Sequence, residues 1–175
     1  MLPESFGGRI IYLIQQYGSS FAKGAGVSMW LALVGTLFGC IIGFLVGIVQ
    51  TIPVDKNDST VKKVLIKIVK FILACYVEFF RGTPMVVQLL LFYYVLLPIV
   101  GGHMSGVQVS MLILGLNSGA YISEIMRSGI LSVDPGQMEG GRAMGLSFAT
   151  TMRKIVIPQA VKNILPTLGN EFISL

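Results

Sequence analysis

A long uncharged stretch near the N-terminus limits the fold of the chain more than any other feature. No charged residue occurs between Lys23 and Asp55, and Val27–Val49 within it is almost entirely apolar. A helix needs about 20 such residues to cross the hydrocarbon core of a bilayer. Every backbone amide must be paired inside lipid, and a helix does this within a single segment. We therefore expect a first membrane span over about residues 27–49.

A glycine repeat runs along this predicted span. Four glycines recur at every fourth position, which places them on one helix face: Gly35, Gly39, Gly43 and Gly47. Small residues at this spacing let two helices approach closely in lipid. The alternative is the general tolerance of membrane helices for glycine. We favour a packing face.

The composition and the basic residues support a membrane protein. Hydrophobic residues make up 54% of the chain and charged residues 12%, against about 25% charged residues in soluble domains. The net charge is +5, but no mixed basic and aromatic patch indicates nucleic acid. Basic residues beside apolar runs instead suit anionic lipid headgroups. Five lysines crowd one region, which predicts that residues 51–70 lie on the cytoplasmic side: Lys56, Lys62, Lys63, Lys67 and Lys70.

Two further spans are predicted from the next uncharged tract. No charged residue lies between Arg81 and Glu124, and Pro98 interrupts the tract beside two glycines. We expect one span over about 64–98, an external turn, and another span over about 107–127. The first is too long for a straight span, and Gly82-Thr83-Pro84 should bend or break it, since proline removes an amide donor. Hydropathy leaves open whether it is one bent span or two short ones.

A polar segment over about 128–154 follows, and we expect it to be cytoplasmic. It contains Asp134-Pro135-Gly136, which is typical of a turn that starts a helix. We predict a short helix from about Gln137 to Leu146 that ends near Gly145. The chain becomes apolar again from about residue 155 and is expected to re-enter the membrane. Residues 1–175 then form a single transmembrane domain.

Several polar residues lie at predicted membrane depth, where ionisable groups are candidates for function. Glu78 and Arg81 are spaced three apart, so they are able to pair on a helix. Gln88 and Asn117 have two open interpretations, contact with a zwitterion that crosses the membrane or bonding between helices. Glu171 is placed to meet a substrate ammonium group. The full set of candidates for a substrate pathway is Glu78, Thr83, Gln88, Asn117, Asn170 and Glu171.

No motif in the sequence indicates an enzyme. The chain lacks a GxxxxGK[ST] phosphate-binding loop, and HExxH and GxSxG are also absent. Cys40 and Cys75 lie in apolar stretches without a CxxC spacing, and His103 has no second ligand nearby in the sequence. We therefore expect no catalytic residue, no metal site and no cofactor bound by this chain.

Two blocks carry a resemblance to a known family. The first is Tyr76–Gln88, and the second runs from Gly119 to Phe172 with its centre at Gly136–Gly145. Together they resemble the polar amino-acid permeases of ATP-binding-cassette importers, whose cytoplasmic EAA loop corresponds to this centre. The resemblance is weak before Thr51 and strong after Tyr76. The family usually has two alanines at Gly140 and Gly141, and it continues past Leu175 to one more span.

The resemblance implies an all-α, polytopic helical membrane protein with a MetI-like permease core, truncated before the last span. It implies a permease subunit that forms the translocation pathway and couples to a separate ATPase through a cytoplasmic coupling helix. Glu139 would anchor that helix, small residues would allow close approach, and Pro158 would fix the return to the membrane. The implied coupling residues are Gln137, Glu139, Gly140, Gly141, Ala143, Gly145 and Pro158.

The resemblance also implies the partners. They are two ATPase subunits that hold ATP and Mg, a second permease copy or a paralogue, and an extracytoplasmic solute-binding protein. The implied location is the cytoplasmic membrane of a prokaryote, with several spans and amino acids as substrates. The alternative is a truncated, non-transporting assembly or regulatory membrane protein. A membrane enzyme is a third class, which the missing motifs disfavour.

Overall fold

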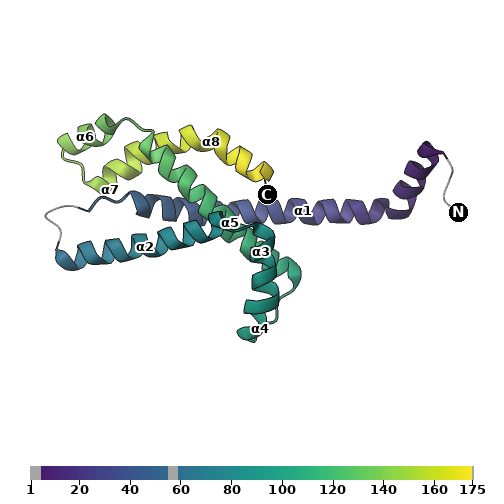
Figure 1. Cartoon of the computed structure of the whole chain (residues 1–175). Coiled ribbons are helices and arrows are strands. Elements are labelled where there is room, and N and C mark those ends of the chain that lie inside the picture. Colours follow the sequence, from purple (N-terminus) through teal and green to yellow (C-terminus); the bar gives the residue numbers. More distant parts are fainter. Residues whose placement is uncertain (1–4, 55–58, 175) are drawn as a thin grey trace.

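The computed structural model describes residues 5–54 and 59–174, and these residues form helices and short connections without any strand (Figure 1). This confirms the predicted all-α fold. Lys56, one of the five clustered lysines, and Leu175 lie outside the described residues.

Helix α1 (Phe6–Thr51) is longer than the span predicted within it. Its 46 residues extend about 69 Å, roughly twice the thickness of a bilayer core. The N-terminal half projects away from the other helices (Figure 1), and its large side chains, such as Phe6 and Phe21, are exposed. The buried residues of α1 all lie in the C-terminal half, beginning at Gly35. That half packs along α5 (Gly106–Leu131).

The glycine repeat is the surface through which α1 contacts α5. A Cβ atom added at Gly43 would lie 2.6 Å from the Cβ of Ile122, and one at Gly47 would lie 2.8 Å from the Cβ of Met126. Real Cβ atoms essentially never approach so closely. The partner residues on α5 also recur at every fourth position, from Leu114 to Met126. The predicted packing face is confirmed.

The second apolar segment is bent by 109°. Helix α2 (Thr60–Gly82) ends where Thr83 becomes extended, and α3 (Met85–Leu90) begins after Pro84. The residue before a proline avoids the helical conformation, so the bend lies at the Gly82-Thr83-Pro84 segment where the sequence predicts it. Helices α1 and α5 are long and apolar enough to cross a membrane, and α2 with the bent continuation makes a third candidate.

Two segments of the described residues are π-helical, and a proline follows each. Segment η1 (Leu91–Leu96) precedes α4 (Leu97–Ile99), which contains Pro98, and η2 (Met152–Val156) precedes α8 (Ile157–Ser174), which contains Pro158. A proline lacks an amide hydrogen and clashes with the carbonyl four residues earlier. In both cases that carbonyl lies in the π-helical segment, whose wider turn accommodates the ring.

The C-terminal third folds back on α5. Helix α6 (Pro135–Ala143) is followed by α7 (Phe148–Thr151), which continues through η2 into α8. An apolar core joins these elements to the end of α5: Met126, Ile130, Val133, Met152, Val156, Ala160 and Ile164. This core fixes α6 and places the end of α8 near the bend between α2 and α3 (Figure 1).

Candidate functional site

The ends of α6 are set by residues that sequence patterns favour there. The Asp134 side chain accepts a hydrogen bond from the Gly136 amide at 2.7 Å, and Pro135 occupies the first turn. At the other end Gly145 has a φ of +83°, and its amide donates to the Arg142 carbonyl at 3.0 Å. Only glycine adopts that conformation without strain. The helix therefore starts two residues before the predicted Gln137 and ends three before the predicted Leu146.

One face of α6 is packed tightly against α7. Gly141 is buried, and a Cβ atom there would lie 2.9 Å from the hydroxyl oxygen of Thr151 and 3.3 Å from its Cβ. Thr151 is fully buried and donates to the Ser147 carbonyl at 3.1 Å, so it is held in place. A Cβ atom at Gly140 would meet nothing within 4 Å. Packing therefore requires only one of the two glycines at the positions where the resembling family has alanines.

The other face of α6 is open to solvent. The predicted coupling residues there are all exposed: Gln137, Glu139, Gly140, Ala143 and Gly145. Met144, which sequence reasoning did not single out, is 83% exposed just beyond the helix. Pro158 lies apart at the start of α8, although the next residue, Gln159, donates to the Gln137 side chain at 3.3 Å. The docking role of these residues stays a prediction.

The position of α6 agrees with the predicted sidedness. Figure 1 shows α6 at the same end of the molecule as the C-terminal end of α1 and the start of α2, the helix that carries the other clustered lysines. Two basic segments at one end of a helical bundle are expected on the same side of a membrane.

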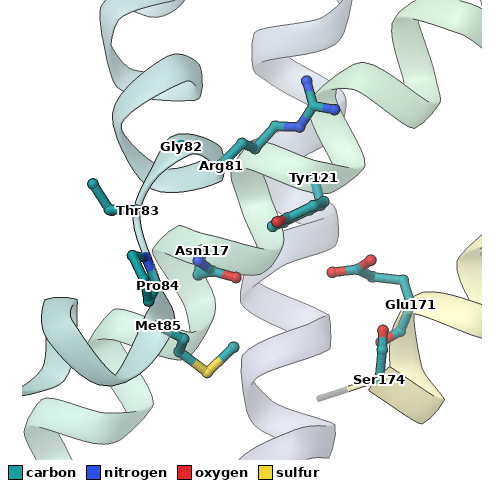
Figure 2. Close-up of a pocket in the computed structure, with 9 residues that line it drawn as sticks. All are labelled: Arg81, Gly82, Thr83, Pro84, Met85, Asn117, Tyr121, Glu171 and Ser174. Atoms are coloured by element: carbon teal, nitrogen blue, oxygen red, sulfur yellow. The ribbon is translucent and has the colours of Figure 1, made fainter.

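A cavity of about 480 Å³ lies at the bend between α2 and α3. Figure 2 shows the Glu171 carboxylate of α8 pointing across it toward Tyr121 of α5. Of the predicted pathway residues, Thr83, Asn117 and Glu171 border this cavity. Glu78, Gln88 and Asn170 do not line it, and the remaining lining residues are Arg81, Gly82, Pro84, Met85, Tyr121 and Ser174.

The amides of Gln88 and Asn117 hold the bend together. Gln88 is 1% exposed, and its Nε2 donates to the Phe80 carbonyl at 2.8 Å and to the Thr83 hydroxyl at 2.8 Å. Asn117 Nδ2 donates to the Phe80 carbonyl and to Gln88 Oε1, both at 3.1 Å. The carbonyl of Phe80, near the end of α2, gains partners that the broken helix cannot supply. This is the bonding between helices that the sequence left open, and contact with a solute stays a prediction.

The charged groups near the bend link α2 to α5. Arg81 Nη1 lies 3.9 Å from Glu124, which also lies 3.7 Å from Arg127. The Arg81 guanidinium stacks over the Tyr121 ring, 5.5 Å from the ring centroid. Among the described residues, the ion pair of Arg81 is with Glu124 rather than with Glu78, because the fold brings α5 alongside α2.

Sequence reasoning did not place Tyr121 or Arg81 in the pathway, although both border the cavity. The position of Tyr121 held a usable signal, since it lies four residues after Asn117 and so shares its helix face. Arg81 borders this cavity and also a second one of about 380 Å³, which is lined by residues of α1, α2 and α5. Within residues 5–54 and 59–174, no three of His, Cys, Asp or Glu are arranged to hold a metal ion.

Comparisons with known proteins agree with this architecture. Residues 64–175 match the model of a family described as binding-protein-dependent transport system inner membrane component. The putative glutamine transport system permease protein GlnP of Rickettsia conorii is 35% identical over 166 residues, covering 94% of this chain and 71% of that protein. The arginine transport system permease protein ArtQ of Bacillus subtilis is 33% identical, covering 87% of this chain and 64% of that protein.

A solved structure is also similar. The crystal structure of an amino acid ABC transporter with histidines superposes with a TM-score of 0.76 at 37% sequence identity. The match covers 92% of this chain and 69% of that one.

Proposed function

Since the chain belongs to the family of binding-protein-dependent transport system inner membrane components, we propose that it is the permease subunit of an ATP-driven importer of polar amino acids. The similar proteins named as glutamine and arginine transport permeases support this substrate class. The alternative, a non-transporting assembly or regulatory protein, has no support from these relatives.

The cavity at the bend is the proposed part of the translocation pathway. Glu171 offers a carboxylate to a substrate ammonium group, and Asn117 and Thr83 line the same cavity. Ionised groups at membrane depth are costly unless they serve a solute or each other. Glu78, Gln88 and Asn170, which lie outside this cavity, remain proposed pathway residues for other conformations of the transporter.

The observation that carries the proposal is the exposed short helix α6 inside the segment that matches the family model. We assign it as the coupling helix. Its Gly141 face is fixed to α7 while Glu139 faces solvent, so a force applied to α6 is transmitted to α8 and α5. ATP-driven closure of two ATPase subunits would thereby shift the permease between two packings of its helices.

The partners follow from the same proposal. ATP and Mg are bound by the ATPase subunits, and an extracytoplasmic solute-binding protein delivers the amino acid. A second permease, identical or paralogous, completes the pathway. The location is the cytoplasmic membrane of a prokaryote.

Reconstituted uptake tests the proposal. The chain is co-expressed with an ATPase and a solute-binding protein of the same family of importers from the same organism, and the complex is placed in proteoliposomes. We expect uptake of labelled glutamine or arginine that requires ATP and the ATPase. Uptake that continues without the ATPase, or a complex that forms but moves no amino acid, would overturn the proposal.

A further inference from the structure

Apart from Glu78 and Arg81, the residues that line the second cavity, of about 380 Å³, have no place in the proposed import pathway. It lies between the end of α1 and the C-terminal halves of α2 and α5, and it is lined by Gln50, Lys70, Ala74, Val77, Glu78, Arg81, Glu124 and Arg127. We propose that this cavity binds the phosphate headgroup of an anionic phospholipid.

A basic stripe on α2 leads into the cavity. Lys63, Lys67 and Lys70 follow the helical spacing of four and three residues, so they share one face. The same face continues through Ala74 to Arg81, and from Lys70 onward its residues line the cavity. Each basic group near a membrane surface attracts anionic headgroups. The lysines of the stripe therefore guide these headgroups toward the cavity.

The cavity also has the hydrogen-bond donors that a phosphate needs. Three cations face two carboxylates, which leaves a net positive charge. The Glu124 contacts of Arg81 and Arg127, at 3.9 and 3.7 Å, are longer than hydrogen bonds. Each guanidinium has five N–H donors, so donors remain for phosphate oxygens. Lys70 gives one of its three N–H donors to the Ile52 carbonyl at 2.6 Å, which fixes the ammonium group at the cavity.

The surroundings favour a lipid over a soluble anion. Beside the basic stripe, α2 exposes large apolar side chains that fit acyl chains, at 50 to 70% relative exposure: Val64, Leu65, Ile68, Phe71 and Ile72. A soluble phosphate would gain nothing from these side chains, whereas a phospholipid gains from both parts of the surface. The C-terminal ends of α1 and α5, which contribute Gln50 and Arg127 to the cavity, lie toward the end of the molecule that carries α6 (Figure 1). This end is predicted to lie at the cytoplasmic leaflet.

Lipid titration of the purified full-length chain in detergent tests the proposal. Binding of phosphatidylglycerol and of phosphatidylcholine is measured by native mass spectrometry. We expect retention of phosphatidylglycerol in preference to phosphatidylcholine, and Lys70→Gln should weaken phosphatidylglycerol binding about fivefold. Lys70→Arg should restore it. Lys162→Gln removes an exposed lysine from α8 and serves as the matched control with unchanged binding.

Each of the following results would overturn the proposal. They are equal retention of both lipids, an equal loss in Lys162→Gln, full binding by Lys70→Gln, and displacement of the lipid by millimolar inorganic phosphate, which would indicate a soluble-anion site. A loss in Lys67→Gln as large as that in Lys70→Gln would also contradict it, since Lys67 is exposed outside the cavity. If Lys70→Gln unfolds without lipid, Arg127→Gln on the facing wall replaces it with the same expected loss.

Discussion

At the scale of single residues, the fold depends on positions where one methyl group does not fit and on amides that have no spare partner. The glycine spacing in α1 predicted a packing face from the sequence alone, because a period of four marks one side of a helix. The identity of the partner, α5, was not predictable, since the matching residues from Leu114 to Met126 are ordinary apolar and small side chains. Only the folded structure shows that the glycines of α1 face these residues of α5.

Replacement of Gly43 tests this contact. Gly43→Ala places a methyl group 2.6 Å from the Ile122 Cβ, so we expect a loss of about 1–3 kcal/mol in the free energy of unfolding. The control is Gly26→Ala on the same helix, where an added Cβ meets nothing within 4 Å. Denaturant unfolding in detergent, followed by circular dichroism, measures both variants. Equal stability of the two variants would contradict the packing account.

The bend depends on Gln88 in a similar way. Gln88→Leu leaves the Phe80 carbonyl and the Asn117 amide short of partners in a buried place, which costs about 1–3 kcal/mol. Gln16→Leu makes the same chemical change at an exposed position of α1 and should have little effect. Unfolding of the two variants under one set of conditions gives the comparison. A Gln88→Leu protein as stable as Gln16→Leu would show that the amide network does not hold the bend.

At the scale of elements, the sequence predicted where helices begin and break better than it predicted their π-helical turns and the ion pairs between them. The break at Gly82-Thr83-Pro84 and the short helix after Asp134 follow from local backbone rules. The two π-helical segments were not predicted, because a proline signals strain but not how the preceding turn relieves it. The Glu78–Arg81 spacing also suggested a pair within one helix, yet the neighbouring α5 supplies Glu124 to Arg81 instead.

The two glycines of α6 should respond differently to substitution. Gly140→Ala adds a methyl group in open space and should stabilise the helix by up to about 1 kcal/mol. Gly141→Ala pushes against Thr151 and should separate α6 from α7, which lowers ATP-dependent uptake. Thr151→Ala removes the hydroxyl and methyl groups in the way, so the double variant should recover uptake. Equal effects of the two alanines, or no recovery, would refute the tight contact.

Charge reversal on α6 tests the proposed docking. Glu139→Lys should abolish ATPase-coupled uptake while membrane insertion and folding remain normal, because Glu139 is exposed and its removal leaves the fold intact. Lys162→Glu reverses an exposed charge on α8 and should leave coupling unchanged. The rates of uptake and of ATP hydrolysis are measured for both variants in proteoliposomes. Normal coupled uptake by Glu139→Lys would exclude it as the anchor.

At the scale of the whole molecule, the arrangement brings chemistry-bearing residues together from distant parts of the chain. Glu171 of α8 reaches the bend at residues 82–84 only because the apolar core fixes the C-terminal third to α5. Glu171, Thr83 and Asn117 were predicted from the sequence as pathway residues. Nothing in the sequence indicated that they border one cavity. The sequence did predict that both basic segments share one side, since positive charge near span ends favours the cytoplasm.

Sidedness of α6 is the claim on which the rest depends, and cysteine labelling measures it directly. Gly140→Cys is introduced after Cys40 and Cys75 are replaced by alanine, and His103→Cys, in the exposed turn before α5, marks the opposite side. We expect an impermeant thiol reagent to label position 140 only in inside-out vesicles, with protection when the ATPase is bound, and position 103 only in right-side-out vesicles. Labelling of position 140 from the outside, or undiminished labelling with the ATPase bound, would contradict the account.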